Sequence, residues 1–474
     1  MIAKPKGLTA LSACDLVKMT RSRQVSCVEV VEACLARADE VNPAINAFCT
    51  IAADRALDAA RAADASVTTN AKMGPLYGVP IALKDLTPTA GIRTTFGSKL
   101  YEHNVPDQDA LLVQRIVAAG GIILGKTNTP EFGHKGITDN LLFGPTRNPW
   151  NTELTAGGSS GGSAAAVVAN IVPIAEGSDG AGSIRIPASL CGAFGFKPTY
   201  GRIPDVVGAF SSHSPFFHNG PIARTVSDAA LFYETVAGAD ISDPFSIPYD
   251  QSAVATLNDG IRGFKIAYSE DLGYFEVCPQ VRDAMRRAVN IFESLGCQVE
   301  PVKLPFDRSV ENCFMTLWHG RMVSRFADLA PEQLDLLEPK VIELIDAGRR
   351  LSALDYCRAN TVRERVWNDL LAVHRRFDLL ICPTTAVPAF PMVTGAPSQI
   401  NGRAISPLIG WFLTYPFNLT GSPAASVPCM TSGHDLPVGI QVIGAHRSDA
   451  LVLRACRAFE QKAPWPMLGA RLPS

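Results

Sequence analysis

Three short segments of this chain carry side chains that could perform nucleophilic chemistry. Lys84 ends the apolar run "GVPIALK", and Ser159 and Ser160 sit between two glycine pairs in "TAGGSSGGSAAA". Ser183 follows a loop of small residues in "GSDGAGSIRIPA". Each segment alone is typical of a solvated charge or a linker, but the three in this order are hard to explain as scaffolding. The amides of residues 180–183 can point together into an anion-binding nest, so the segments predict one catalytic site.

Two other motifs match in letters but not in context. Residues 120–127 have the spacing of a P-loop, but residues 121–124 form an apolar run typical of a buried strand, and a proline follows soon after the lysine. Gly157, Ser159 and Gly161 match the G-x-S-x-G turn of α/β-hydrolases, but the residues before them are polar and turn-rich instead of strand-like. No later histidine stands in an evident catalytic loop: His319, His374, His434 and His446.

The elements that must position the three segments follow an alternating pattern. The first 65 residues look helical, with a capping box at Ser26 and Glu29. From residue 76 strand-like and helix-like runs alternate, and a second stretch of this kind begins near residue 262. This alternation predicts an α/β sheet with Lys84 at a carboxyl edge, where open sheets bind ligands. Residues 331–377 look like a charged helical surface layer.

Composition excludes several classes of protein. The 474 residues hold 43 basic and 45 acidic side chains, so nothing favours nucleic acid or an anionic membrane surface. The longest apolar run, residues 164–175, is too short to span a bilayer. The 12 cysteines include no C-x-x-C pair, which indicates reduced thiols instead of a disulfide frame or a metal site. We therefore expect a cytoplasmic protein without a metal, and a homodimer stays an open expectation.

The motifs together resemble one known family. The segments "GVPIALKD", "TAGGSSGGSAAA" and "GSDGAGSIRIPASLCGAFGFKPTYGRIP" look like the amidase signature family, whose members hydrolyse amides and related acyl compounds. The resemblance covers nearly the whole chain and implies a single large α/β/α sandwich with a mixed, mainly parallel central sheet. It also implies a helical segment (1–65) that packs on the main domain (66–474), with 265–415 carrying substrate-specific helices and loops. Ala181 departs from the glycine that many relatives carry in the loop before the nucleophile.

The resemblance also implies the roles of the site residues. It assigns Ser183 as nucleophile, Ser159 as a bridging serine on a cis peptide, and Lys84 as base. The pKa of such a lysine must fall from about 10.4 to about 7–8. The oxyanion hole would be Gly180, Ala181, Gly182 and Ser183, and the supporting residues Ser160, Asp179 and Arg185. No cofactor is implied.

The substrate is less well defined by the sequence. In relatives the segment with Gly133 and His134 lines the acyl site. The aromatic residues of 205–218 and 406–416, among them Phe210 and Trp411, suggest an apolar or aryl group. We expect a small-molecule substrate, a neutral amide of small to medium size, with esters and carbamates (a urethanase activity) as further candidates. The alternative is the A subunit of a glutamine-dependent tRNA amidotransferase, which acts only with partner subunits.

Overall fold

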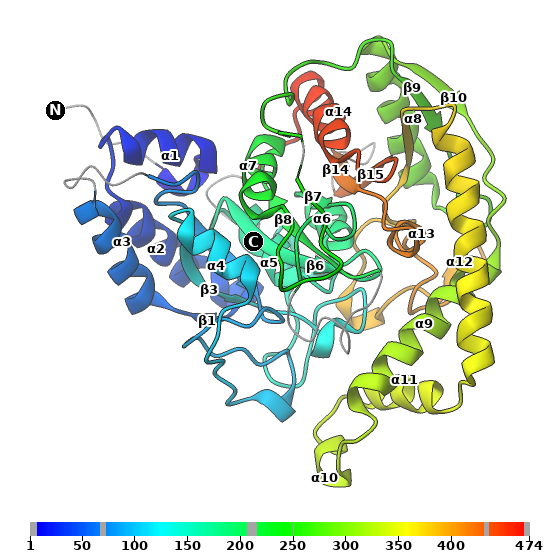
Figure 1. The fold of residues 1–474 in the computed structure, drawn as a ribbon, viewed down its shortest axis with the longest axis horizontal. Coiled ribbons are helices and arrows are strands. Elements are labelled where there is room, and N and C mark those ends of the chain that lie inside the picture. Colours follow the sequence, from blue (N-terminus) through cyan, green and yellow to red (C-terminus); the bar gives the residue numbers. More distant parts are fainter. Residues whose placement is uncertain (1–6, 67–72, 206–215, 250, 431–435, 469–474) are drawn as a thin grey trace.

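A computed structural model describes residues 7–66, 73–205, 216–249, 251–430 and 436–468 (Figure 1). Within these ranges eleven strands form one sheet in the order β1-β3-β2-β6-β8-β7-β14-β15-β11-β9-β10. Its strands are β1 (Phe48–Ile51), β2 (Pro80–Lys84), β3 (Ile122–Thr127), β6 (Ile174–Asp179), β7 (Phe194–Lys197), β8 (His218–Ala223), β9 (Lys265–Tyr268), β10 (Gln298–Pro301), β11 (Leu379–Pro383), β14 (Ala424–Met430) and β15 (Pro437–Gly444). Two small ribbons pair β4 (Arg147–Asn148) with β5 (Asn151–Thr155), and β12 (Gln399–Ile400) with β13 (Arg403–Ala404).

The sheet is mixed, as the sequence predicts. Strands β3, β2 and β6 run parallel to one another, and so do β11, β9 and β10. Between these two blocks β6, β8, β7, β14, β15 and β11 pair antiparallel. The parallel pairs are therefore gathered in the two outer blocks, and the middle of the sheet is antiparallel.

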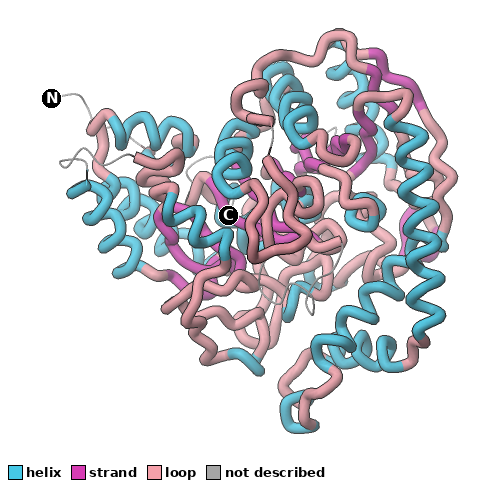
Figure 2. Tube along the Cα trace, viewed as in Figure 1, coloured by secondary structure: helices cyan, strands magenta, loops and turns pink. Residues whose placement is uncertain are grey.

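Helices cover both faces of the sheet, so the predicted α/β/α layering is confirmed (Figure 2). One layer holds α2, α3, α5 and α6, and the other holds α4, α7, α14 and α8. The helix bounds are α1 (Ala13–Arg21), α2 (Cys27–Ile45), α3 (Ala53–Ser66), α4 (Leu111–Ala118), α5 (Gly161–Val168), α6 (Arg185–Cys191), α7 (Val226–Val236), α8 (Pro279–Ser294), α9 (Arg308–Phe326), α10 (Pro331–Leu334), α11 (Pro339–Arg349), α12 (Ala353–His374), α13 (Pro416–Leu419) and α14 (Asp449–Lys462). Alternation along β2 serves both layers, because Ile81 and Leu83 join one apolar cluster and Ala82 joins the other.

The N-terminal segment contains the predicted helices and one strand that the sequence pattern missed. The capping box is present, since the Glu29 amide donates to Ser26 Oγ at 3.1 Å and the Ser26 amide donates to Glu29 Oε2 at 2.9 Å. Between α2 and α3, however, β1 pairs antiparallel with β3 and forms an edge of the central sheet. Four residues between two long helices give too short a pattern to predict a strand.

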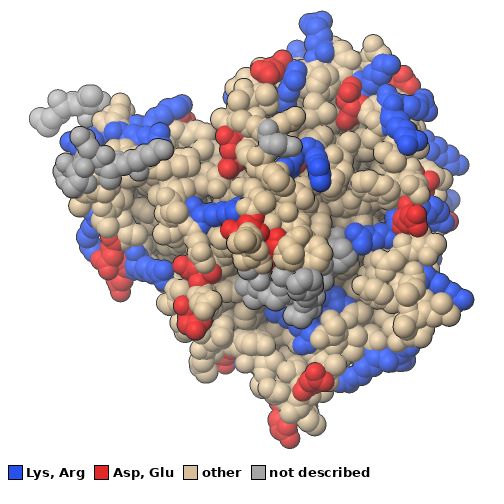
Figure 3. All heavy atoms as spheres, in the orientation of Figure 1, with Lys and Arg blue, Asp and Glu red and all other residues tan. Residues whose placement is uncertain are grey.

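The helical layer predicted at 331–377 is present as α10, α11 and α12. Helix α9 packs against α11 and α12, and these helices form one side of the molecule, drawn from green to yellow in Figure 1. Lysine, arginine and acidic side chains are scattered together over the face drawn in Figure 3. Among the described residues we find no helix that combines the length and the apolar character needed to cross a membrane.

Candidate active site

Lys84 occupies the carboxyl end of β2 and is completely buried. Its Nζ lies 2.6 Å from Oγ of Ser159 and 3.1 Å from Oγ of Ser178. The predicted contact between the lysine and the first serine is therefore formed. Ser178, the second partner, was not anticipated, because nothing in the sequence separates it from the other small residues that lead into the loop.

Burial controls the charge of Lys84. Removal from water lowers the pKa of the Lys84 ammonium to about 7, although the carboxylates of Glu176 and Asp179 act in the opposite direction. A lysine with this pKa is neutral in a large fraction of molecules near pH 7. It can therefore accept a proton from a hydroxyl group, as a general base must.

Ser159 stands on a turn that only glycine-rich sequence can form. The peptide bond between Gly158 and Ser159 is cis, as the family resemblance implies. Gly157 has a φ of 75°, in the left-handed region that favours glycine. A Cβ on Gly158 would lie 2.6 Å from the carbonyl carbon of Ile137, so a side chain has no room there. The turn leads directly into α5, which holds it against the sheet.

Ser160 links the serine turn to the loop of Ser183. Its amide donates to the carbonyl oxygen of Ser183 at 3.1 Å. Its Oγ donates to the carbonyl oxygen of Ser178 at 3.3 Å and accepts from the Ser178 amide at 3.3 Å. These are supporting contacts, and they fix the spacing between the segments that carry Ser159 and Ser183.

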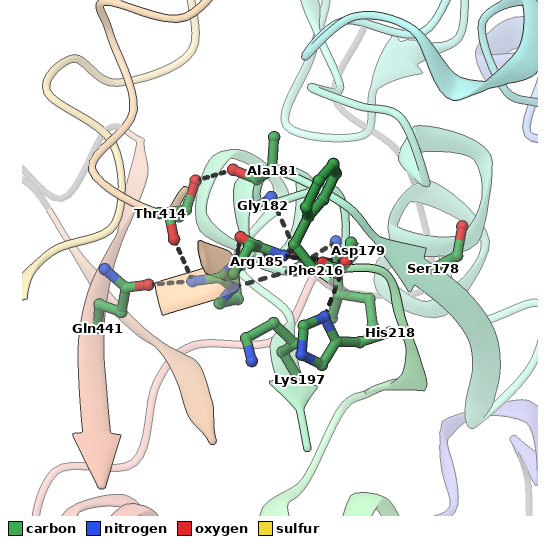
Figure 4. A network of polar contacts seen from close by, with 12 residues as sticks. Ser178, Asp179, Ala181, Gly182, Arg185, Lys197, Phe216, His218, Thr414 and Gln441 are labelled. Atoms are coloured by element: carbon green, nitrogen blue, oxygen red, sulfur yellow. Dashed lines mark hydrogen bonds and ion pairs between the residues drawn. The ribbon is translucent and has the colours of Figure 1, made fainter. Parts of the chain in front are cut away.

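The loop of Ser183 is braced by a buried ion pair (Figure 4). Asp179 ends β6 and Arg185 begins α6, and both side chains are fully buried. Nη2 and Nε of Arg185 donate to the two carboxylate oxygens of Asp179 at 2.8 and 2.9 Å. Arg185 also donates to the carbonyl oxygen of Thr414 at 3.0 Å, and Asn418 donates to Asp179 Oδ1 at 2.8 Å. The pair thus ties the loop to the segment 414–418.

Asp179 keeps its charge although it is buried. Burial by itself would raise the pKa of the Asp179 carboxyl, but Arg185 and the amide of Asn418 hold that pKa well below its usual range. The carboxylate is therefore ionised at every pH at which the protein works. It can act as a constant acceptor for amides of the loop.

One part of the predicted oxyanion hole needs correction. The amide of Gly182 donates to Asp179 Oδ1 at 2.7 Å, so it is already used within the loop. No hydrogen bond within the described part of the chain occupies the amides of Gly180, Ala181 and Ser183. The hydroxyl of Thr414 donates to the Ala181 carbonyl oxygen from behind, which orients that peptide unit. The amides that can serve an oxyanion are therefore those of 180, 181 and 183.

Ser159 and Ser183 open into one pocket with an empty volume of about 470 Å³. Two of the aromatic residues expected near the site, Phe217 and Phe412, are in its wall. The sequence analysis missed two others, Phe314 and Trp318, which α9 contributes one helical turn apart. That spacing was the available signal. The remaining apolar wall residues are Leu86, Ile186, Leu408 and Ile409.

The segment around Gly133 lines the pocket through its main chain. Gly133 has a φ of 71°, and a Cβ there would lie 3.1 Å from Oγ of Ser159. The imidazole of His134 is buried behind the wall: Nδ1 lies 2.8 Å from the Glu131 carbonyl oxygen, and Nε2 lies 3.7 Å from a Glu338 carboxylate oxygen. Burial and Lys135 lower the pKa of His134 to about 3, so the ring is neutral.

Trp411 does not line the pocket. It is 1% exposed, its Nε1 donates to the Pro407 carbonyl oxygen at 3.0 Å, and its ring packs between Phe390 and Phe412. An aromatic pattern does not distinguish a ring that forms the pocket wall from one behind it. Phe210 lies outside the described residues. In the described ranges no three His, Cys, Asp or Glu side chains gather as a metal site would require.

Comparison with known proteins identifies the family. A family model described as Amidase matches residues 29–453, and the chain belongs to the amidase signature family of hydrolases. It is 40% identical over 465 residues to an acylamidase of Rhodococcus erythropolis, a match that covers 97% of each chain. It is also 35% identical over 476 residues to the A subunit of the glutamyl-tRNA(Gln) amidotransferase of Carboxydothermus hydrogenoformans, covering 95% of this chain and 97% of the relative. The solved structure of a bacterial aryl acylamidase superposes with a TM-score of 0.92 at 35% identity, covering 96% of each chain.

Proposed function

We propose that this chain hydrolyses carboxylic amides through an acyl-enzyme on Ser183. Ser183 attacks the carbonyl carbon, its proton passes to Ser159, and the proton of Ser159 passes to neutral Lys84. The proton then returns by the same path to the leaving amine, and water releases the acid from Ser183. This relay needs no histidine, because the buried lysine is the base.

The observation that carries the proposal is the contact between Lys84 and Ser159. The 2.6 Å distance between Nζ and Oγ is that of a short hydrogen bond in a site without competing water. Ser159 lines the same pocket as Ser183, and the amide of Ser160 is bonded to the Ser183 carbonyl oxygen. A proton can therefore move between the pocket and the buried lysine through one hydroxyl group.

The oxyanion formed by the attack would be held by main-chain amides. Those of Gly180, Ala181 and Ser183 belong to a loop that Asp179 and Arg185 keep rigid. Rigid donors in a buried site stabilise developing charge, and the loss of one donor in such sites costs about 3–4 kcal/mol of transition-state stabilisation. The Ala181 methyl leaves this donor set intact, because it replaces only a hydrogen on Cα.

The pocket supports a neutral substrate with an apolar or aryl group. Its wall holds three phenylalanines and a tryptophan, so the favourable contribution to binding comes from apolar contact. The relatives named acylamidase and aryl acylamidase agree with this class. Esters and carbamates present the same carbonyl to Ser183 and are included in the proposed range.

The experiment uses the purified chain alone. We expect it to release the aniline from a chromogenic N-acyl anilide, and we expect a fluorophosphonate to add once to the wild-type protein, as read by intact mass. Ser183→Ala should lose both reactions and Lys84→Ala should lose most of the turnover. An adduct of equal yield on the Ser183→Ala protein would contradict the assignment of the nucleophile.

A second candidate function is supported by the relatives named as the A chain component of a glutamyl-tRNA(Gln) amidotransferase. Such a protein would release ammonia from glutamine and act with partner subunits. The aromatic wall favours the free-standing amidase, because glutamine presents a charged amino acid group to that wall. Glutamine and the anilide compared side by side separate the two: release of ammonia without turnover of any anilide, ester or carbamate would favour the second function.

A further inference from the structure

A second buried carboxylate borders the proposed base. Glu176 lies on β6, next to β2 in the sheet, and is as deeply buried as Lys84. Its Oε2 accepts the backbone amide of Lys84 at 2.9 Å and the hydroxyl of Thr87 at 3.0 Å. Glu176 and Ser178 are two residues apart on one strand, so their side chains leave the same face. Ser178 is the residue whose Oγ contacts Lys84 Nζ, which places Glu176 on the side of the lysine.

The carboxylate of Glu176 is only half satisfied. Within the described residues, Oε1 is buried and has no hydrogen-bond partner. Buried polar atoms without partners are uncommon and costly, so an oxygen of this kind requires a reason. No contact of Oε1 holds any part of the fold in place. A purely structural role would be served by Oε2 alone, and a neutral glutamine would provide that acceptor equally well.

The charged groups around Glu176 come from three strands. Lys84 faces it from β2 and Lys126 from β3, while Asp179 of its own strand β6 acts on Lys84 as well. Burial raises the pKa of Glu176 and the two lysines oppose that rise. In return an ionised Glu176 raises the pKa of Lys84 against the effect of burial. The protonation of Glu176 and that of Lys84 are thus linked.

We propose that Glu176 is a positioning residue whose negative charge sets the pH range in which Lys84 acts as base. The inference rests on the proposed relay through Ser159. When Lys84 accepts the proton, the new ammonium lies beside the ionised Glu176 and is stabilised by it. The proton remains on Nζ until it returns through Ser159 to the leaving amine, so Glu176 exchanges no proton during the cycle. A carboxylate inside an otherwise apolar strand was the signal in the sequence.

The test replaces the charge and keeps the shape. Glu176→Gln retains an acceptor for the Lys84 amide and removes the negative charge. Without that charge the ammonium is less stable, so the acidic limb of the kcat/KM profile should move to lower pH by about one unit. The control is Ser163→Ala, because Ser163 donates to the backbone oxygen of the same residue at 2.8 Å and carries no charge. Its acidic limb should stay where the wild type has it.

A second variant keeps the test valid if Glu176→Gln does not fold. Thr87→Val removes one donor from Oε2 and leaves the glutamate in place. The carboxylate is then ionised in a smaller fraction of molecules, so the limb should move in the same direction by less. A folded Glu176→Gln protein with an unmoved limb would overturn the proposal, and so would an unmoved limb in Thr87→Val if that is the variant that folds.

The rate of fluorophosphonate labelling at Ser183 gives the same profile without any substrate. This readout separates the two proposals. Wild-type labelling that depends on Ser183 and Lys84, with an unmoved limb in the variants, rejects only the role of Glu176. Labelling that does not depend on Ser183 rejects the proposed function itself.

Discussion

Replacing Gly133 with alanine tests whether the position of Ser159 is critical, and the chain provides a matched control. Gly133 has a φ of 71° and Gly144 a φ of 72°, so an alanine is equally strained at both positions. At Gly144 the new methyl would meet nothing within 4 Å. At Gly133 it would lie 3.0 Å from a Leu86 methyl and 3.1 Å from Oγ of Ser159. The difference between the two variants therefore isolates the contact with the active site.

The magnitude follows from these distances. A non-glycine residue in the left-handed region costs about 1–2 kcal/mol, so both variants should lose that much stability. A contact near 3.0 Å requires a neighbour to move by a few tenths of an ångström. Ser159 has little freedom to move, since its Oγ is held 2.6 Å from Lys84 Nζ. Because a misplacement of about 1 Å can cost about 100-fold in rate, a shift of this size should lower kcat/KM about tenfold.

The assay is kcat/KM for an anilide, or the rate of fluorophosphonate labelling, measured for both variants next to the wild type. We expect similar unfolding midpoints in urea for the two variants and a loss of activity only in Gly133→Ala. Wild-type kcat/KM in Gly133→Ala would refute the argument that the Ser159 hydroxyl must keep this position. An equal loss of activity in Gly144→Ala would show that backbone strain alone accounts for the effect.

The same site supports three further predictions. Because an ammonium cannot accept a proton and the pKa of Lys84 is about 7, kcat/KM should fall about tenfold per pH unit below that value; a flat profile down to pH 5 would contradict this. Asp179→Asn should lower the free energy of unfolding by about 3–5 kcal/mol, because the buried charge of Arg185 loses its partner; an unchanged urea midpoint would refute it. Trp318→Ala should raise KM for an aryl amide at least tenfold, since a large apolar side chain is lost from the wall, whereas Trp411→Phe should leave KM unchanged; equal effects would contradict the assignment of the wall.

The sequence predicts the catalytic centre well because each part of it depends on local structure. An apolar run that ends in lysine indicates a strand with a side chain at its edge, and β2 ends at Lys84. A serine between glycine pairs indicates a tight turn, and Gly157 and the cis peptide before Ser159 form one. The small residues before Ser183 indicate a loop that opens a helix, and α6 follows it. In each case neighbours in sequence determine the conformation.

The pocket wall and the partners of the site are predicted less well because they depend on contacts between distant segments. Trp318 reaches the pocket only because α9 packs beside the loop of Ser183, far away in sequence. Trp411 is in an aromatic run next to Phe412, yet only Phe412 faces the pocket. The amide of Gly182 is taken by Asp179, which is a matter of loop geometry that composition does not reveal. Such features follow from tertiary packing, and no local pattern encodes them.

Three lysines are fully buried in the core around the sheet, and their partners explain why only one of them can serve as a base. Burial lowers the pKa of Lys84, Lys126 and Lys197 alike. Lys197 donates to two backbone carbonyl oxygens, and Lys126 donates to a backbone carbonyl and to the Thr89 hydroxyl at 3.0 Å. A carbonyl has no proton to give, and Thr89 is not in the wall of the Ser183 pocket. Lys84 alone among the three contacts a hydroxyl that opens into that pocket, so its lost charge becomes the capacity to accept a proton from the nucleophile.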